Sequence, residues 1–191
     1  MERAVFLDRD GTIIEDIGYP HERSIIKFLP RVSKAVRLLN ESGFKVIIIT
    51  NQAGVARGYF TEDTVKEINK YIQETLTKER AFIDMIYYCP HHIDGIIEKY
   101  RKDCYCRKPN PGMIEQAARE FGIDLEKSFV IGDKSSDIEA GRRAGCRTVL
   151  LTTENPSLND KGTIVISDYT APDLYEAVKW LVKPVSKKRG C

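Results

Sequence analysis

Short apolar segments alternate with segments of helical periodicity along this 191-residue chain, and this alternation constrains its fold more than any other feature. Strand-like runs are predicted at residues 4–7, 45–50, 83–88, 128–131, 147–151 and 163–166. Helices are predicted between and after them, at residues 30–41, 61–79, 111–121, 135–144 and 171–181. This alternation predicts an α/β protein with a Rossmann-like, doubly wound, mainly parallel sheet and helices on both faces.

Length and composition restrict the class of protein further. The chain is predicted to form a single domain over residues 1–191, and its net charge of +2 gives no reason to expect a nucleic-acid partner. No apolar run approaches the roughly 20 residues that cross a bilayer. The first residues lack the pattern of a secretory signal. We therefore expect a cytoplasmic protein without a membrane partner. Because little exposed apolar patterning is evident in the sequence, we also expect a monomer.

Polar side chains follow three of the predicted strands. These groups are Asp8 and Asp10 after the first strand, Thr50 and Asn51 after the second, and Gly132, Asp133 and Lys134 after the strand at 128–131. Because ligands of parallel sheets collect at the carboxyl ends of the strands, the three groups are expected to share one edge. Turn chemistry alone could explain any one of them, but the three together favour a functional site.

The two aspartates after the first strand predict a metal site. Residues two apart in an extended chain point the same way, so Asp8 and Asp10 could face one small volume. Carboxylates this close repel unless a cation screens them or one of them is protonated. A hard divalent ion such as Mg²⁺, with Asp133 as a further ligand, satisfies this requirement. Gly11 allows a tight turn beside the site, and Thr12 can offer a hydroxyl or an amide to an anion.

Four ordered motifs resemble those of the haloacid dehalogenase (HAD) superfamily of phosphotransferases. They are Asp8-Arg9-Asp10-Gly11-Thr12, Thr50-Asn51, Lys108, and Gly132-Asp133-Lys134-Ser135-Ser136-Asp137. The resemblance implies that Asp8 attacks phosphorus to form an aspartyl-phosphate, while Asp10 protonates the leaving alcohol and later activates water. It also implies that Mg²⁺ binds the carboxylates of Asp8 and Asp133 and the main-chain carbonyl of Asp10. The side chains implied to hold phosphoryl oxygens or to neutralise the acids are Thr50, Lys108 and Lys134.

Three positions within these motifs need separate interpretation. Dehalogenating members of the superfamily lack an acid where this chain has Asp10, so the resemblance implies a phosphatase. Arg9 is expected to point away from the metal site and to be structural. Asp137 is either a side chain behind the metal site or an ordinary acid in the first turn of a helix.

Cysteine and histidine residues cluster in the polar segment 89–110. Twelve residues separate the pair Cys89 and His91 from the pair Cys104 and Cys106. Three thiolates and an imidazole suit tetrahedral zinc, and a complete shell of protein ligands makes that metal structural. Unrelated free thiols are the alternative, and His92 is an adjacent alternative ligand. The resemblance to zinc-loop members of the superfamily favours His91.

The zinc loop is predicted to orient two basic residues. Arg107 and Lys108 directly follow the last zinc ligand, Cys106, so a bound metal would aim both cations at the phosphate site. The resemblance implies that Arg107 binds a second phosphate of the substrate, which suits the bidentate geometry of a guanidinium. An exposed arginine without this role is the alternative.

Motifs spread along the chain narrow the family further. The chain resembles the heptose bisphosphate phosphatases of the superfamily in five stretches, which are DRDGT, TNQAGVARG, YYCPHH, CxCRKPxPGM and GDKxxD. Histidinol-phosphate phosphatases, whose zinc loop is shorter, are the main alternative. An inactive zinc-loop binding module is a third, which the complete set of catalytic acids disfavours.

The resemblance to these phosphatases implies a phosphorylated sugar as substrate and a site without a large cap. It places the enzyme in the synthesis of nucleotide-activated heptose. The implied substrate contacts are Asp10, Gly11, Thr12, Asp16, Ile17, Gly18, Tyr19, Thr50, Asn51, Gln52, Ala53, Arg107, Lys108 and Lys134.

Overall fold

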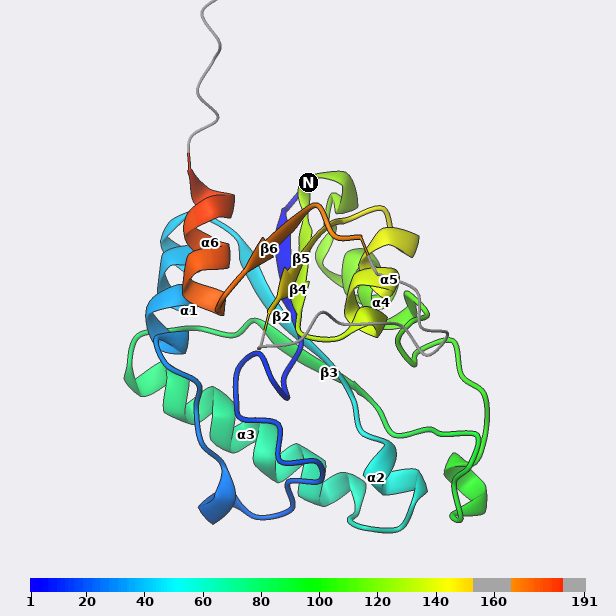
Figure 1. The fold of residues 1–191 in the computed structure, drawn as a ribbon. Coiled ribbons are helices and arrows are strands. Elements are labelled where there is room, and N and C mark those ends of the chain that lie inside the picture. Colours follow the sequence, from blue (N-terminus) through cyan, green and yellow to red (C-terminus); the bar gives the residue numbers. More distant parts are fainter. Residues whose placement is uncertain (153–165, 184–191) are drawn as a thin grey trace, which may run out of the picture.

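Six parallel strands form one sheet in the computed structural model, which describes residues 1–152 and 166–183 (Figure 1). In spatial order they are β3 (Met85–Cys89), β2 (Lys45–Asn51), β1 (Ala4–Leu7), β4 (Phe129–Gly132), β5 (Arg147–Leu151) and β6 (Tyr169–Ala171). All neighbouring strands pair in parallel. The strand order reverses between β1 and β4, and open α/β sheets bind ligands at such a switch point. The predicted doubly wound fold is confirmed.

Helices cover both faces of the sheet (Figure 1). One face carries α1 (Val32–Glu41), α3 (Glu62–Lys78) and α6 (Leu174–Val182), and the other carries α4 (Gly112–Phe121) and α5 (Ser135–Arg143). Because side chains alternate along a strand, Val5 and Leu7 of β1 pack in the first layer, and Ala4 and Phe6 pack in the second. Among the described residues, no helix is both long and apolar enough to cross a bilayer.

Local sequence signals identify the ends of two helices correctly. α3 begins after Thr61, whose hydroxyl accepts a hydrogen bond from the Thr64 N–H at 3.3 Å, as an N-cap residue does. α4 ends at Gly122, which adopts a left-handed conformation with φ of 63°. The helices predicted at 61–79 and 111–121 are therefore confirmed to within one residue at each end.

Short elements were not predicted, because they contain too few residues for a period to show. They are the helix α2 (Ala53–Ala56) and the 3₁₀ turns Arg23–Ile25, Glu98–Tyr100 and Leu125–Lys127. The predicted start of the last helix is wrong, since residues 169–171 form β6 and α6 begins at Leu174. The strand predicted at 163–166 lies outside the described residues, except for residue 166.

Candidate active site and metal centres

The first acidic residue stands at the carboxyl end of β1. The Asp8 N–H donates to the Ile131 carbonyl at 3.0 Å, which continues the pairing of β1 with β4 to the strand ends. The chain then turns at Gly11, where φ is +90°. A Cβ atom at Gly11 would lie 2.2 Å from Asp133 Oδ2, so only glycine leaves room for the carboxylate there. The turn thereby allows Asp8 and Asp133 to lie together.

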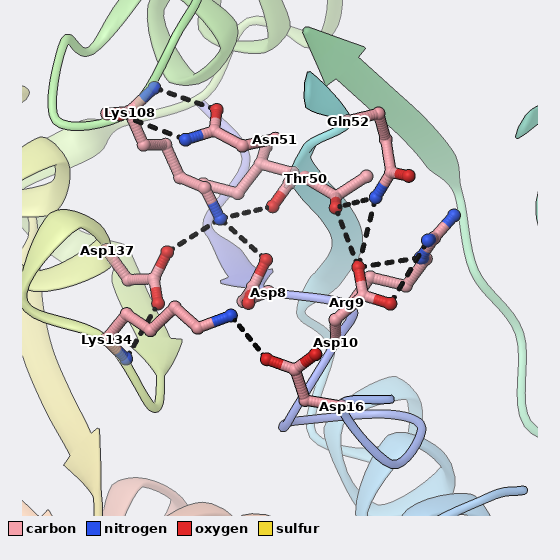
Figure 2. A network of polar contacts seen from close by, with 11 residues as sticks. Asp8, Arg9, Asp10, Asp16, Thr50, Asn51, Gln52, Lys108, Lys134 and Asp137 are labelled. Atoms are coloured by element: carbon pink, nitrogen blue, oxygen red, sulfur yellow. Dashed lines mark hydrogen bonds and ion pairs between the residues drawn. The ribbon is translucent and has the colours of Figure 1, made fainter. Parts of the chain in front are cut away.

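Lys108 connects the zinc loop to this edge of the sheet (Figure 2). Its buried Nζ donates to Asp8 Oδ1 at 2.6 Å and to the Ile49 carbonyl at 2.8 Å. It also pairs with Asp137 Oδ1 at 2.6 Å. The Asn51 side chain holds the Lys108 backbone through two hydrogen bonds, one to its carbonyl and one from its N–H, each 3.0 Å long. Burial alone would lower the pKa of Lys108, but Asp137 and Asp8 together raise it, so the lysine stays charged.

Asp8, Asp133 and Asp137 form an acidic group that suits a divalent cation. One carboxylate oxygen from each lies within 4.8 Å of the others. Burial, and then the negative charge of Asp8, raise the pKa of both Asp133 and Asp137. A bound cation would favour the ionised carboxylates again, and hard divalent ions prefer oxygen ligands. The residues present therefore fit the predicted magnesium ion.

Asp137 combines the two interpretations that its sequence position allowed. It is fully buried in the first turn of α5, and its Oδ2 accepts a hydrogen bond from the Lys134 N–H at 3.1 Å. Its Oδ1 belongs to the ion pair with Lys108. Asp137 is thus both a helix-capping acid and a member of the acidic group. Its spacing of four residues from Asp133 is the only sequence signal of the second role.

The Asp10 carboxylate lies outside the acidic group and is surrounded by donors (Figure 2). Arg9 contacts both of its oxygens, with Nε 3.1 Å from Oδ2 and Nη2 3.1 Å from Oδ1. Oδ2 also accepts hydrogen bonds from Gln52 Nε2 at 3.0 Å and from Thr50 Oγ1 at 3.3 Å. The prediction that Arg9 is only structural missed this contact with Asp10.

The segment between β1 and α1 borders the site through Asp16. Lys134 Nζ donates to Asp16 Oδ2 at 2.7 Å, and the Gly18 N–H donates to Asp16 Oδ1 at 2.9 Å. Burial would lower the pKa of Lys134, but the hydrogen bond to Asp16 and the charges of Asp8 and Asp133 raise it above its ordinary value. The charge of Lys134 therefore acts on the acidic group, while its hydrogen bond goes to Asp16.

An open cavity of about 820 Å³ lies over these residues. It is lined by all of the predicted substrate contacts except Gly11, Thr12, Ile17 and Thr50. Thr12 is fully buried, and its hydroxyl makes no hydrogen bond within the described part of the chain. Ile17 is exposed to solvent. His92 lines the cavity from the loop 89–110, and the sequence predicted no such place for it.

The predicted zinc ligands converge in the loop that follows β3. Ligand atoms of Cys89, His91, Cys104 and Cys106 all lie within 4.8 Å of one another. His91 Nδ1 is 3.7 Å from Cys89 Sγ and 3.5 Å from Cys106 Sγ. Ordinary zinc bond lengths in a tetrahedron place nitrogen and sulfur about 3.6 Å apart. Burial also lowers the pKa of His91, which keeps the imidazole neutral. The residues therefore fit zinc, and His91 rather than His92 belongs to the group.

Side-chain contacts that the sequence did not predict attach β3 and this loop to α3. Tyr88 Oη donates to Glu62 Oε2 at 2.7 Å, and Tyr100 Oη donates to Glu62 Oε1 at 2.5 Å. Glu62 stands in the first turn of α3. Within the loop, Arg107 Nη1 donates to the His91 carbonyl at 3.2 Å. The arginine beside the cavity is thus tied to the backbone of a candidate zinc ligand.

Known proteins are similar to this chain in sequence and in fold. A family model described as HAD-hydrolase-like matches residues 105–177. The D-glycero-alpha-D-manno-heptose-1,7-bisphosphate 7-phosphatase of Photorhabdus laumondii is 40% identical and covers 87% of this chain and 91% of its own length. The D-glycero-beta-D-manno-heptose-1,7-bisphosphate 7-phosphatase of Haemophilus influenzae is also 40% identical, over 92% of this chain and 95% of its own length. The crystal structure of D,D-heptose 1,7-bisphosphate phosphatase from B. bronchiseptica, complexed with magnesium and phosphate, has a TM-score of 0.81 at 29% identity, over 94% of this chain and 98% of that one.

The strand order and the acids at the strand ends define a HAD-like hydrolase of the phosphatase type. The resemblance predicted from the motifs is confirmed. On the strength of relatives 40% identical over nearly their whole length, the chain belongs to the D-glycero-D-manno-heptose-1,7-bisphosphate 7-phosphatase family of phosphoric monoester hydrolases.

Proposed function

We propose that this protein hydrolyses the 7-phosphate of D-glycero-D-manno-heptose 1,7-bisphosphate through an aspartyl-phosphate on Asp8. The main support for this mechanism is the position of Asp8 at the carboxyl edge of the sheet. There it forms an ion pair with buried Lys108, with a distance of 2.6 Å. Asp10 lines the cavity in front of that edge. The names of relatives 40% identical to this chain support the substrate.

We infer that Mg²⁺ is the catalytic cation, held by the carboxylates of Asp8 and Asp133 and the main-chain carbonyl of Asp10. The raised pKa of Asp133 supports this, because burial and the charge of Asp8 make its ionised form costly without a cation. The related B. bronchiseptica structure is described with magnesium and phosphate. When bound, magnesium would neutralise charge on the oxygens of the transferred phosphoryl group.

In the first half-reaction, a carboxylate oxygen of Asp8 forms a bond to phosphorus. The bond between phosphorus and the C7 oxygen of the sugar breaks. Asp10 gives a proton to that departing oxygen, so the sugar leaves as a neutral alcohol. Thr50 and Lys108 hold phosphoryl oxygens, and Lys134 balances their negative charge.

In the second half-reaction, a water molecule attacks the phosphorus of the aspartyl-phosphate. The Asp10 carboxylate takes the proton of this water. The bond between phosphorus and Asp8 breaks, and inorganic phosphate leaves. Asp8 returns to a carboxylate and Asp10 to its protonated form, so the cycle closes without another reactant.

Recognition of the sugar bisphosphate is assigned to the cavity and its zinc loop. Arg107 lines the cavity and is half-buried, and we infer that it binds the phosphate at C1. A relative named for the alpha anomer is 40% identical to this chain, and relatives named for the beta anomer are 40% to 45% identical, so we assign no anomer from similarity. We also propose that the enzyme acts as a cytoplasmic monomer in the synthesis of nucleotide-activated heptose.

We infer that Zn²⁺ binds Cys89, His91, Cys104 and Cys106 as a structural metal. Four protein ligands leave no position for water or substrate, so this metal takes no part in the chemistry. Its effect on catalysis is indirect, through the loop that positions Arg107 and Lys108.

Phosphate release from purified protein tests the proposed function. Both anomers of heptose 1,7-bisphosphate and histidinol phosphate are compared, each with Mg²⁺ and with a magnesium chelator. We expect Mg²⁺-dependent release from a heptose bisphosphate and little from histidinol phosphate. Preference for histidinol phosphate would replace the proposed substrate, and equal activity without magnesium would remove the metal from the scheme.

A further inference from the structure

Arg9 is the largest fully buried side chain in the described part of the chain. Taking an arginine charge out of water is costly, and a well-packed apolar side chain often serves stability as well. All of its nitrogens have partners: Nε and Nη2 donate to Asp10, and Nη1 donates to Asn69 Oδ1 at 3.0 Å. Packing alone therefore does not explain why a charged side chain with these partners occupies this position.

The two oxygens of the Asp10 carboxylate are held differently (Figure 2). Oδ2 accepts hydrogen bonds from Arg9 Nε, Gln52 Nε2 and Thr50 Oγ1. Oδ1 accepts one from Arg9 Nη2 and from no other donor among residues 1–152 and 166–183. A carboxylate oxygen can accept about two hydrogen bonds, so Oδ1 keeps a lone pair for exchanging a proton. Because paired N–H groups fix the plane of a carboxylate, Arg9 determines where that lone pair points.

Asn69 occupies a core-facing position of α3 that an apolar residue would normally fill. The other buried residues of this helix are Val65, Ile68, Ile72 and Leu76, and Asn69 lies in the same stripe with 7% of its surface exposed. Its amide oxygen accepts the hydrogen bond from Arg9. The guanidinium is thus held on one side by a 17-residue helix packed on the sheet, and on the other side by Asp10.

We propose that Arg9 and Asn69 are positioning residues, which orient the Asp10 carboxylate so that Oδ1 exchanges protons with the sugar oxygen and with water. Neither residue touches the substrate in this role, and the inference rests on the function proposed above. A purely structural pair would support folding without affecting one chemical step more than another.

The leaving group of the substrate separates the two roles. A sugar alcohol needs a proton to depart, whereas p-nitrophenolate departs without one. Formation of the aspartyl-phosphate is therefore measured by rapid quench with heptose 1,7-bisphosphate and with p-nitrophenyl phosphate. The variants are Arg9→Gln, Asn69→Leu and the conservative Asn69→Asp, which keeps an acceptor for Arg9. Asn40→Leu is the matched control, because within the described residues the Asn40 side chain bonds only the Phe82 backbone, at 2.9 and 3.0 Å.

We expect Arg9→Gln to slow the step with the sugar bisphosphate about 100-fold, at the low end of the range for general acid catalysis. We expect Asn69→Leu to slow it about 10-fold, because Asp10 keeps Arg9 in that variant. KM should change less than about threefold, and the step with p-nitrophenyl phosphate should stay near the wild-type rate. Asn69→Asp should restore most of the sugar-phosphate rate, and Asn40→Leu should match the wild type. If Arg9→Gln does not fold, the rates of Asn69→Leu with the two substrates test the inference.

Equal losses with both leaving groups would overturn the inference, as would wild-type rates in both Arg9→Gln and Asn69→Leu. If the wild-type enzyme is active, either result would overturn only this inference and not the proposed function. A wild-type protein that releases no phosphate from heptose bisphosphate with Mg²⁺ would overturn the proposed function and this inference with it.

Discussion

The acidic site and the thiol site of this protein gather their ligands in different ways. Asp8 and Asp133 directly follow neighbouring strands of the sheet, and buried Lys108 forms an ion pair with Asp8. In the thiol site only Cys89 belongs to a strand, and the other ligands lie in the loop that follows it. Strand pairing therefore brings the acids of the first site together, whereas we expect the loop of the second site to depend on its proposed zinc ion.

This difference corresponds to a division of roles, in which the acidic site would carry out the chemistry and the thiol site would support substrate recognition. The acidic site carries the proposed nucleophile at the end of β1, inside the sheet between β2 and β4, and the thiol site carries the loop that presents Arg107 to the cavity. Damage to the acidic site should abolish turnover and leave the zinc loop intact. Damage to the thiol site should weaken substrate binding and positioning while the sheet stays folded.

The largest effect is expected from Asp8→Asn, which removes the nucleophile but keeps its shape. We expect turnover to fall by roughly 10⁴-fold or more, as for other nucleophile removals. Zinc content, measured by atomic absorption, should stay at the wild-type level, and substrate binding should be retained in calorimetry. Turnover near the wild-type level would remove the covalent step from the mechanism.

The second prediction concerns Lys108→Met, which leaves two buried acids without their cation. Breaking a buried ion pair costs about 3–5 kcal/mol, so both the free energy of unfolding and turnover should fall steeply. Urea denaturation measures the first effect. Lys127→Met is the control, because the pair of Lys127 with Asp124 at 2.7 Å is mostly exposed on the lysine side and such pairs contribute less than about 1 kcal/mol. A similar loss in both variants would contradict the buried role of Lys108.

The third prediction concerns the thiol site. Cys104→Ser should release zinc, raise KM and lower kcat together, by about 10-fold to 100-fold in all, because the loop no longer positions the two cations after Cys106. Cys146→Ser is the matched control, since Cys146 is a buried thiol outside the cluster. Normal kinetics in a zinc-free protein supplied with Mg²⁺ would show that the loop holds its shape without the metal.

The smallest effect is expected from Glu62→Gln, which weakens the attachment of the zinc loop to α3. The hydrogen bond from Tyr100, and then that from Tyr88, lower the pKa of Glu62 in the folded protein. Its contribution is therefore complete above the ordinary glutamate pKa of about 4.3 and is lost as the pH falls through the lowered folded value. Zinc release should be a few-fold faster in the variant near neutral pH, and the difference from wild type should shrink in acid. A difference that grows in acid would contradict this sign.

Much of the fold and of both sites could be predicted from local signals. The apolar runs identified most of the strands, and Thr61 and Gly122 marked helix ends that the structure has. The acids and the lysine at strand ends, together with the paired cysteines, indicated which side chains the structure brings together. These signals act over a few neighbouring residues, so they can be recognised in the sequence without knowledge of the packing.

Other features could not be predicted, because they join residues far apart in the chain. The contact of Arg9 with Asn69 spans 60 residues, and Glu62 meets Tyr88 and Tyr100 across 26 and 38. No periodicity links such partners, and each pairing depends on how a helix lies on the sheet. The three-residue strand β6 was missed for a related reason, since only its neighbour β5 makes it a strand.

The sequence by itself determined the α/β class, the strand ends that carry the acids and the identity of the four candidate zinc ligands. Periodicity and turn chemistry are properties of neighbouring residues, and they need no fold to act. The tertiary structure alone decided that Asp137 belongs with the acids and that Arg9 holds Asp10. Those outcomes depend on distances between separate elements, which only packing sets.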